Sequence, residues 1–227
     1  MLQMMNQAEL EALARQGFNR IPLIAETFAD LDTALSLYLK LANQPFSYLL
    51  ESVQGGERFG RYSIIGLQAR TRIVARGRAV EVVDGEQVVE SAVDVNPLDF
   101  VQSYLARFKT PPYAGLPRFT GGLAGYFGYE TVRYIERRLA ATQKPDVLDV
   151  PDVLLLLSEE LAVVDNLSGK LYFIVYADPA RPDAYEAAKG RLQGLVRQLR
   201  QPVTVPESPP LDKTVATSEF GEAGRSE

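Results

Sequence analysis

The chain has 227 residues, of which 46% are hydrophobic and 23% charged, and its formal net charge is -5. This length and composition are typical of one large globular domain, or of a domain with a piece of another. The acidic balance argues against a general nucleic-acid-binding protein, so small molecules or proteins are the expected partners. The absence of cysteine and histidine excludes disulfides, thiolate catalysis and imidazole chemistry.

The N-terminal residues, 1–15, are polar and acidic and lack a positive segment followed by an apolar one. We therefore expect no secretory signal peptide. No window of the sequence approaches the roughly 18 apolar residues that a membrane-spanning helix requires. The expectation is a cytoplasmic enzyme, or part of one, that contacts neither a membrane nor nucleic acid.

The first part of the chain is expected to form two helices around an extended segment. Residues 7–16 carry apolar residues on one side, and Gly17 stands where a glycine commonly ends a helix. Residues 19–26 are extended and apolar, and a second helix begins at Asp30 or Asp32. Its apolar residues at helical spacing are Leu31, Ala34, Leu35, Tyr38 and Leu41.

The next segment ends an apolar strand on a carboxylate. Residues 48–50 favour a strand, which continues directly into Glu51 and Ser52. A glycine-rich loop and a second short strand, residues 62–65, follow. Two such strands would gather polar side chains suited to a small zwitterion, namely Glu51, Ser52, Arg61 and Ser63. The alternative is a hairpin whose polar residues simply face water.

A change to period-two alternation over residues 70–91 predicts an antiparallel meander with one face in water. The dipeptide Asp84-Gly85 within it favours a hairpin turn. Asn96 followed by Pro97 then predicts the start of a helix. The apolar stripe of this helix consists of Phe100, Val101, Tyr104, Leu105 and Phe108.

A glycine-rich run over residues 118–130 contains Gly121, Gly122, Gly125 and Gly128. Its spacing matches neither the dinucleotide fingerprint nor a Walker loop, so we do not expect it to bind phosphate. We interpret these glycines as sites of close backbone packing, or of a bulge in a buried strand. A helix is expected over residues 131–139, with its inward face formed by Val132, Ile135 and Leu139.

The last third of the chain is expected to contain a hairpin, a helix and a tail. Residues 152–164 include a run without alternation, as in a strand covered on both sides, and residues 171–177 return beside it. A helix follows Pro182, with a buried stripe of Tyr185, Ala188, Leu192, Leu195, Val196 and Leu199. Residues 201–227 are rich in Pro, Glu, Ser and Thr, which is typical of a linker or disordered tail.

These elements predict an α+β fold, a mainly antiparallel β-sheet flanked by helices. Helices interleave with hairpins, and the alternation of strand, helix and strand that builds a doubly wound sheet is missing. Residues 1–200 are expected to form one domain, and residues 201–227 a linker or tail that leads away from it.

Three segments of the sequence carry a resemblance to a known family. They are residues 47–52 with 60–66, the glycine-rich run 118–130, and the hairpin around residues 156–160 with Asp165 and Asn166. In order and spacing they resemble the N-terminal region of anthranilate synthase component I, over about residues 15–200. The related large subunit of aminodeoxychorismate synthase shares the glycine-rich run but usually matches residues 49–52 poorly.

The resemblance implies an enzyme that converts chorismate and glutamine-derived ammonia to anthranilate and pyruvate, with Mg²⁺ as cofactor. It implies a partner, the glutamine amidotransferase subunit called anthranilate synthase component II, which supplies the ammonia. It also implies feedback inhibition by L-tryptophan, whose site in this family includes the segment at residues 49–52. By position, Glu51 and Ser52 would be the binding pair, and Tyr62 and Ser63 would stand on the second strand that lines the pocket.

The chemistry of tryptophan agrees with that assignment. The ligand presents an ammonium, a carboxylate and an indole, so its site needs an acceptor, one or two donors and an apolar slot. Glu51 would accept from the ammonium, and the Ser52 hydroxyl with nearby backbone N–H groups would bind the carboxylate. Leu50 and Tyr62 would line the slot for the indole. With the resemblance, ligand binding is favoured over the solvated hairpin.

The sequence departs from the family at its end. Family members continue into a second half that carries the chorismate and Mg²⁺ sites, whereas this sequence stops at Glu227. We therefore expect a truncated chain with no catalytic residue, no metal of its own and an incomplete tryptophan pocket. Two other interpretations stay open, a piece of aminodeoxychorismate synthase and a non-enzymatic scaffold for the amidotransferase subunit.

Overall fold

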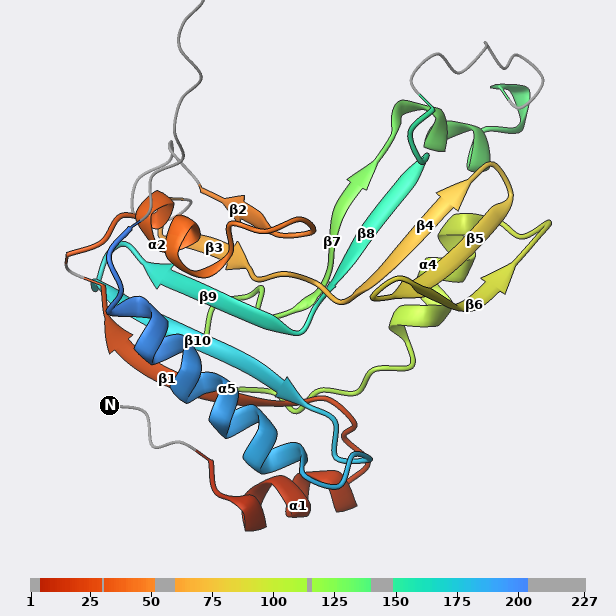
Figure 1. The fold of residues 1–227 in the computed structure, drawn as a ribbon. Coiled ribbons are helices and arrows are strands. Elements are labelled where there is room, and N and C mark those ends of the chain that lie inside the picture. Colours follow the sequence, from red (N-terminus) through yellow and green to blue (C-terminus); the bar gives the residue numbers. More distant parts are fainter. Residues whose placement is uncertain (1–4, 30, 52–59, 114–115, 140–148, 204–227) are drawn as a thin grey trace, which may run out of the picture.

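The computed structural model describes residues 5–29, 31–51, 60–113, 116–139 and 149–203 (Figure 1). All strand pairs among them are antiparallel, and the strands form two five-stranded sheets, called sheet A and sheet B below. The predicted α+β fold is confirmed, with two sheets in place of one. The predicted tail falls almost wholly outside the described residues.

Each sheet combines strands that are distant in the sequence. Sheet A has the order β1, β10, β9, β3 and β2, with the bounds Ile21–Phe28, Lys170–Ala177, Glu160–Asp165, Tyr62–Gly66 and Tyr48–Leu50. Sheet B has the order β6, β5, β4, β8 and β7, with the bounds Gln87–Ala92, Ala79–Asp84, Thr71–Arg76, Val153–Ser158 and Gly122–Phe127. The connections from β3 to β4 and from β8 to β9 join the two sheets, which lie side by side in Figure 1.

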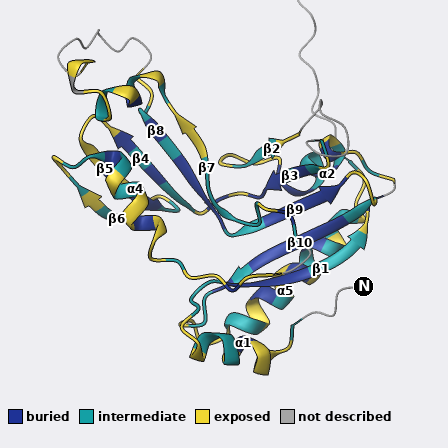
Figure 2. Cartoon of the chain, turned by 180° about the vertical axis from the view of Figure 1, so that it is seen from behind, coloured by how far each residue is buried: buried dark blue, intermediate teal, exposed yellow. Residues whose placement is uncertain are grey.

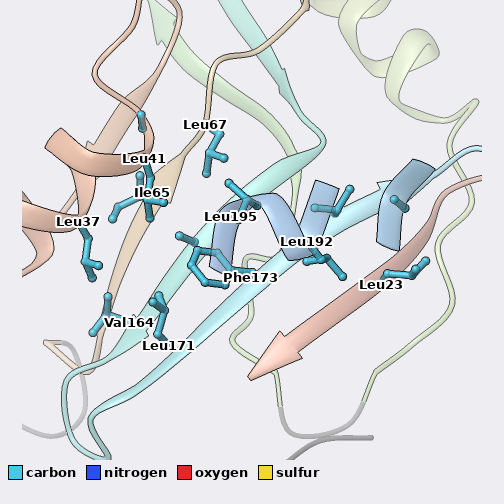
Figure 3. Packing of buried hydrophobic residues seen from close by; sticks show 14 of the residues in the cluster. Leu23, Leu37, Leu41, Ile65, Leu67, Val164, Leu171, Phe173, Leu192 and Leu195 are labelled. Atoms are coloured by element: carbon cyan, nitrogen blue, oxygen red, sulfur yellow. The ribbon is translucent and has the colours of Figure 1, made fainter. Parts of the chain in front are cut away.

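Three helices cover one face of sheet A, and a fourth packs on sheet B. The helices on sheet A are α1 (Gln7–Arg15), α2 (Ala34–Leu41) and α5 (Ala184–Leu199). The helix on sheet B is α4 (Pro97–Leu105). All six residues of the stripe predicted for the last helix belong to the core under α5 or pack against it. Figure 3 shows Leu192 and Leu195 of this helix against Phe173 of β10. Among the described residues, no helix is long and apolar enough to cross a membrane.

The other face of sheet A carries an apolar cluster of its own. Its buried members are Ile24, Leu161, Val163, Tyr172 and Ile174. Leu116 and Phe119, from the segment before β7, pack against it. Figure 2 shows this side of the molecule, with α5 behind the sheet. Tyr62 and Ile64 of β3 join the same cluster, so this apolar face extends to the β2–β3 edge of the sheet.

The second helix begins later than predicted. Thr33 is its N-cap, because the Thr33 hydroxyl accepts a hydrogen bond from the backbone N–H of Ser36 at 3.1 Å. Asp32 instead pairs with Lys40, whose Nζ lies 2.8 Å from the carboxylate. Asp30, the other predicted start, lies outside the described residues.

The later start changes which residues of α2 are buried. Leu37 is fully buried, with Ala34 and Leu41 on the same side, whereas Leu35 is 56% exposed. Leu31 precedes the helix and is fully exposed. The predicted stripe is therefore wrong at Leu31 and Leu35. Leu31 lies before the helix begins, and Leu35 faces away from sheet A.

Sheet B follows the prediction closely. The meander expected over residues 70–91 is confirmed as β4, β5 and β6. Asn96 caps α4 by accepting a hydrogen bond from the N–H of Leu98 at 3.0 Å. Tyr104 is buried, but Leu105 is 43% exposed. The predicted stripe is wrong at Leu105, since the next residue along a helix lies about 100° around its axis.

The apolar segment 152–164 is two strands and not one. The chain leaves sheet B after β8 and enters sheet A at β9, with Glu159 between the strands. The Glu159 carboxylate lies 2.9 Å from Arg20, and its carbonyl accepts a hydrogen bond from the N–H of Tyr176. A polar residue thus marks the point where the chain changes sheets, and β9 alone forms the predicted hairpin with β10.

The glycine-rich run forms β7, the edge strand of sheet B. It is half exposed, so the expectation of a buried strand is wrong. The close approach expected at its glycines is confirmed. A Cβ atom added to Gly125 would lie 2.0 Å from the carbonyl oxygen of Leu154, and one added to Gly121 would lie 2.6 Å from the ring of Tyr176.

The segment after β7 forms two 3₁₀-helices in place of the predicted α-helix. These are η1, Tyr129–Tyr134, and η2, Arg137–Leu139. The Tyr134 hydroxyl donates to the carboxylate of Asp152 at 2.8 Å, which ties the segment to sheet B by a polar contact. Ile135 is 72% exposed, so the predicted inward face is wrong.

Candidate functional site

The described candidate residues lie on β2 and β3, or directly beside them, at one edge of sheet A. Leu50 is the last residue of β2 and lies opposite Ile64 of β3. Its side chain is 52% exposed, and Glu51, directly after it, is exposed as well. Ser52 lies outside the described residues. The structure therefore exposes an apolar residue and the acidic residue that follows it at this edge.

Tyr62 lies on the same face of sheet A as Leu50. Residues directly opposite one another in an antiparallel pair point to one face, so Leu50 shares the face of Ile64. Tyr62 stands two residues before Ile64 on the same strand and points the same way. Both residues of β3 pack against the apolar cluster of this face. An apolar surface therefore begins at Leu50, one residue before the exposed Glu51.

Ser63 lies on the opposite face of the sheet. It is fully buried, and its partner across the ladder, Val164, belongs to the core under the helices. The Ser63 hydroxyl accepts a hydrogen bond from Nδ2 of Asn166 at 3.1 Å. The sheet separates Ser63 from Tyr62, and the Ser63 hydroxyl contacts the turn after β9.

Arg61 directly precedes β3 and is paired with Asp165, the last residue of β9. Its Nη2 lies 2.7 Å from the Asp165 carboxylate, and its Nε donates to the same group. The guanidinium carbon also lies 5.0 Å from the ring centroid of Tyr62. The Asp165 side chain is only 3% exposed, and the hydrogen bonds from Arg61 hold the pKa of its carboxyl below the usual value. Arg61 is therefore engaged within the protein.

Two contacts at this edge involve residues that the sequence did not single out for a site. Tyr48 was expected only as a strand residue, yet its hydroxyl lies 2.7 Å from the hydroxyl of Ser158. These residues are 110 positions apart, and no local pattern indicates their contact. Asp165 was named only as part of the family resemblance, without a partner. A carboxylate directly after an apolar strand needs a partner when it is buried, which is the signal that could have indicated the pair with Arg61.

A cavity of about 160 Å³ lies where the two sheets meet. Glu159 lines it and pairs with Arg20, while the Tyr176 hydroxyl is hydrogen-bonded to Thr120 at 3.2 Å. Burial raises the pKa of the Glu159 carboxyl, and Arg20 only partly opposes this effect. These polar groups already have partners, so we place no ligand in this cavity.

Among the described residues, the oxygen donors that a magnesium ion needs are not gathered at one place. Magnesium prefers several oxygen ligands in near-octahedral geometry. Among the described residues, no group of three or more acidic, histidine or cysteine side chains could hold a metal ion. The described residues therefore do not fit the Mg²⁺ that the family resemblance implies.

The sequence is similar to curated proteins of one name. Over 222 residues it is 57% identical to "Anthranilate synthase component 1" of Neisseria meningitidis serogroup C, which covers 96% of this chain and 45% of that protein. Over 200 residues it is 54% identical to the protein of the same name from Pseudomonas putida, covering 88% and 41%. No protein-family model matches the chain. The chain spans less than half the length of these curated relatives.

A solved structure agrees with these relatives. The crystal structure of anthranilate synthase component I from Streptococcus pneumoniae TIGR4 is similar with a TM-score of 0.52 and 25% sequence identity, covering 77% of this chain and 36% of that one. Sequence and fold therefore lead to the same relatives, and the resemblance drawn from the three segments is confirmed. Over almost its whole length, the chain matches the N-terminal region of the anthranilate synthase component I family.

Proposed function

We propose that the chain is the N-terminal portion of an anthranilate synthase component I and acts in tryptophan biosynthesis. The reaction of the full-length protein would convert chorismate and ammonia from glutamine to anthranilate and pyruvate, and component II would supply the ammonia. The observation that carries this proposal is the 57% identity to a protein of that name over 96% of the chain. A cytoplasmic location fits this role.

The catalytic chemistry would belong to the part of the relatives that this chain does not match. The chain covers 45% of the first of them, and we assign no catalytic residue and no magnesium ligand to it. The expected result is that the chain alone forms no anthranilate from chorismate, ammonium and Mg²⁺. Steady production of anthranilate by the pure chain would contradict this division of labour.

The role that we propose for the chain itself is to bind L-tryptophan as a feedback inhibitor. The residues that would contact the ligand are Leu50, Glu51, Ser52 and Tyr62, and Ser63 would support them from the other face of the sheet. Support comes from the exposed Glu51, which directly follows Leu50 in the chain, and from the apolar face that Leu50 and Tyr62 share. Ser63 would contribute indirectly, because its hydrogen bond from Asn166 holds the strand that carries Tyr62.

In this site the three parts of tryptophan would meet three kinds of group. The Glu51 carboxylate would accept hydrogen bonds from the ammonium, and the Ser52 hydroxyl would donate to the carboxylate. The indole would lie on Leu50 and Tyr62, where contact with hydrocarbon removes apolar area from water. Hydrogen bonds to charged groups contribute roughly 1.5 to 3 kcal/mol each, enough to orient the amino acid.

Titration calorimetry of the chain with L-tryptophan tests the proposed site. We expect weak binding by the wild type, since the pocket would be incomplete, and a large loss of affinity in Ser52→Phe, because a bulky ring would fill the slot. Ser91→Phe places the same ring on an exposed position of β6, in the other sheet, and serves as the control. Equal heats from the wild type and Ser52→Phe would sink the proposal.

A non-catalytic scaffold for component II is the alternative from another class of function. It predicts that the chain co-purifies with component II and that tryptophan has no effect on the chain or on the complex. A piece of aminodeoxychorismate synthase is the second alternative. Eight curated relatives that are 30% to 57% identical carry the name anthranilate synthase component 1, which favours the first proposal.

A further inference from the structure

Strand β2 carries Leu50 at its end and is held in place by few backbone contacts. It spans only Tyr48–Leu50 and stands at the edge of sheet A, where β3 is its single neighbour among the described strands. Isolated pairs of short strands are marginally stable in water. The position of Leu50 and Glu51 therefore depends on side chains that fix β2.

The ring of Tyr48 lies directly on the backbone of β3. Tyr48 is opposite Gly66 in the ladder, and a Cβ atom added to Gly66 would lie 2.1 Å from Cε1 and 2.2 Å from Cζ of this ring. Only glycine leaves that space open. An aromatic side chain laid across a glycine of the neighbouring strand is a known way to stabilise strand pairing and register.

The hydroxyl of Tyr48 then reaches the other sheet. It lies 2.7 Å from the hydroxyl of Ser158, the last residue of β8 in sheet B, and Ser158 is only 3% exposed. Burial raises the pKa of the Tyr48 phenol, so it stays protonated and available as a donor. This hydrogen bond links β2 to the place where the chain passes from sheet B to sheet A.

We propose that Tyr48 is a positioning residue of the amino-acid site: its ring on Gly66 and its hydrogen bond to Ser158 hold Leu50 and Glu51 in the arrangement that binds L-tryptophan. This inference rests on the proposed function and names a residue outside the proposed site. Without the hydrogen bond, β2 occupies the binding arrangement for a smaller fraction of the time. The apparent affinity for ligand falls in proportion to that fraction.

The test compares two tyrosines that each lose one hydroxyl. Tyr48→Phe removes the bond to Ser158 and keeps the ring on Gly66, whereas Tyr176→Phe removes the bond to Thr120 and leaves β2 untouched. Calorimetry with L-tryptophan should show two- to tenfold weaker binding for Tyr48→Phe, roughly the value of one hydrogen bond. Tyr176→Phe should bind like the wild type.

A second measurement follows β2 without ligand. Hydrogen exchange of the peptide covering residues 47–51 should be faster in Tyr48→Phe than in the wild type, while a peptide from β5 should exchange equally in both.

Ser158→Ala should reproduce the loss of affinity for L-tryptophan, and the double variant should bind no more weakly than Tyr48→Phe alone.

The outcomes separate this inference from the proposed function. Unchanged affinity in Tyr48→Phe, or an equal loss in Tyr176→Phe, overturns the positioning role while tryptophan binding stands. A wild-type chain that does not bind tryptophan contradicts the proposed function, and the inference fails with it. Faster exchange at residues 47–51 together with weaker binding supports the role of Tyr48.

Discussion

The guanidinium of Arg61 and the buried carboxylate of Asp165 form a direct ion pair, with Nη2 and Oδ2 2.7 Å apart and a further hydrogen bond from Nε. The pair joins the start of β3 to the end of β9. Because Tyr62 follows Arg61 directly, the pair also places the first residue of the apolar face on β3. A contact that looks purely structural therefore supports the candidate site.

This ion pair should make stability depend on pH. The hydrogen bonds from Arg61 lower the pKa of Asp165 in the folded state. The contribution of the ion pair to stability is therefore complete above the unfolded-state pKa of about 3.9, and it is lost as the pH falls through the lower folded-state pKa. Asp165→Asn should therefore be less stable than the wild type at pH 7, and the gap should narrow below about pH 4. Urea denaturation at several pH values measures it, with the exposed position Glu81→Gln as the control.

Glu159 should show the opposite dependence on pH. Burial raises the pKa of its carboxyl, so the folded state favours the protonated form. The stability that protonation contributes is lost as the pH rises from the unfolded-state pKa of about 4.3 through the higher folded-state pKa. Glu159→Gln should gain stability relative to the wild type over that range. Denaturation curves in which the difference keeps one value from pH 4 to 8 would contradict this assignment.

Two glycine substitutions should have opposite effects on stability. Gly125→Ala forces a methyl group against the carbonyl of Leu154 and should lower the free energy of unfolding by about 1–3 kcal/mol. Gly190→Ala has open space on the exposed side of α5 and should raise it by about 0.5–1 kcal/mol. Thermal unfolding of both variants checks the pair, and a Gly125→Ala variant as stable as the wild type would contradict the close approach of Gly125 to Leu154.

Helix α2 offers a direct comparison of two leucines. Leu37→Ala removes a fully buried side chain and should cost about 2–5 kcal/mol. Leu35→Ala removes a side chain that is 56% exposed and should change the free energy of unfolding by less than about 0.5 kcal/mol. The sequence pattern selected Leu35 and not Leu37, so equal losses in urea denaturation would favour the predicted stripe over the observed packing.

Much of the fold could be predicted because its signals are local. The helix start at Asn96, the meander around Asp84 and the stripe of α5 all depend on residues within a few positions of one another. The errors occur where a distant contact overrides the pattern. Leu35 and Leu105 have apolar neighbours at helical spacing, yet the surface that the helix covers leaves both exposed.

The candidate site was found in the sequence only in part. The carboxylate at the end of an apolar strand singled out Glu51, and the family resemblance added Tyr62 and Ser63 by position. The ladder then separates these two neighbours onto opposite faces, with Ser63 against the helix-covered core. They separate because successive side chains along a strand point to opposite faces, so residues that are neighbours in the sequence do not share a site.

The sequence by itself determined the class of fold and most of the short elements, because turn residues, caps and apolar spacing act between near neighbours. The family was indicated by the resemblance of three segments. Only the tertiary structure decided that the apolar segment 152–164 divides at Glu159 between two sheets. It also decided that Tyr48 spans Gly66 to reach Ser158. Those contacts form only after strands more than a hundred residues apart have met, so their energies are absent from any local pattern.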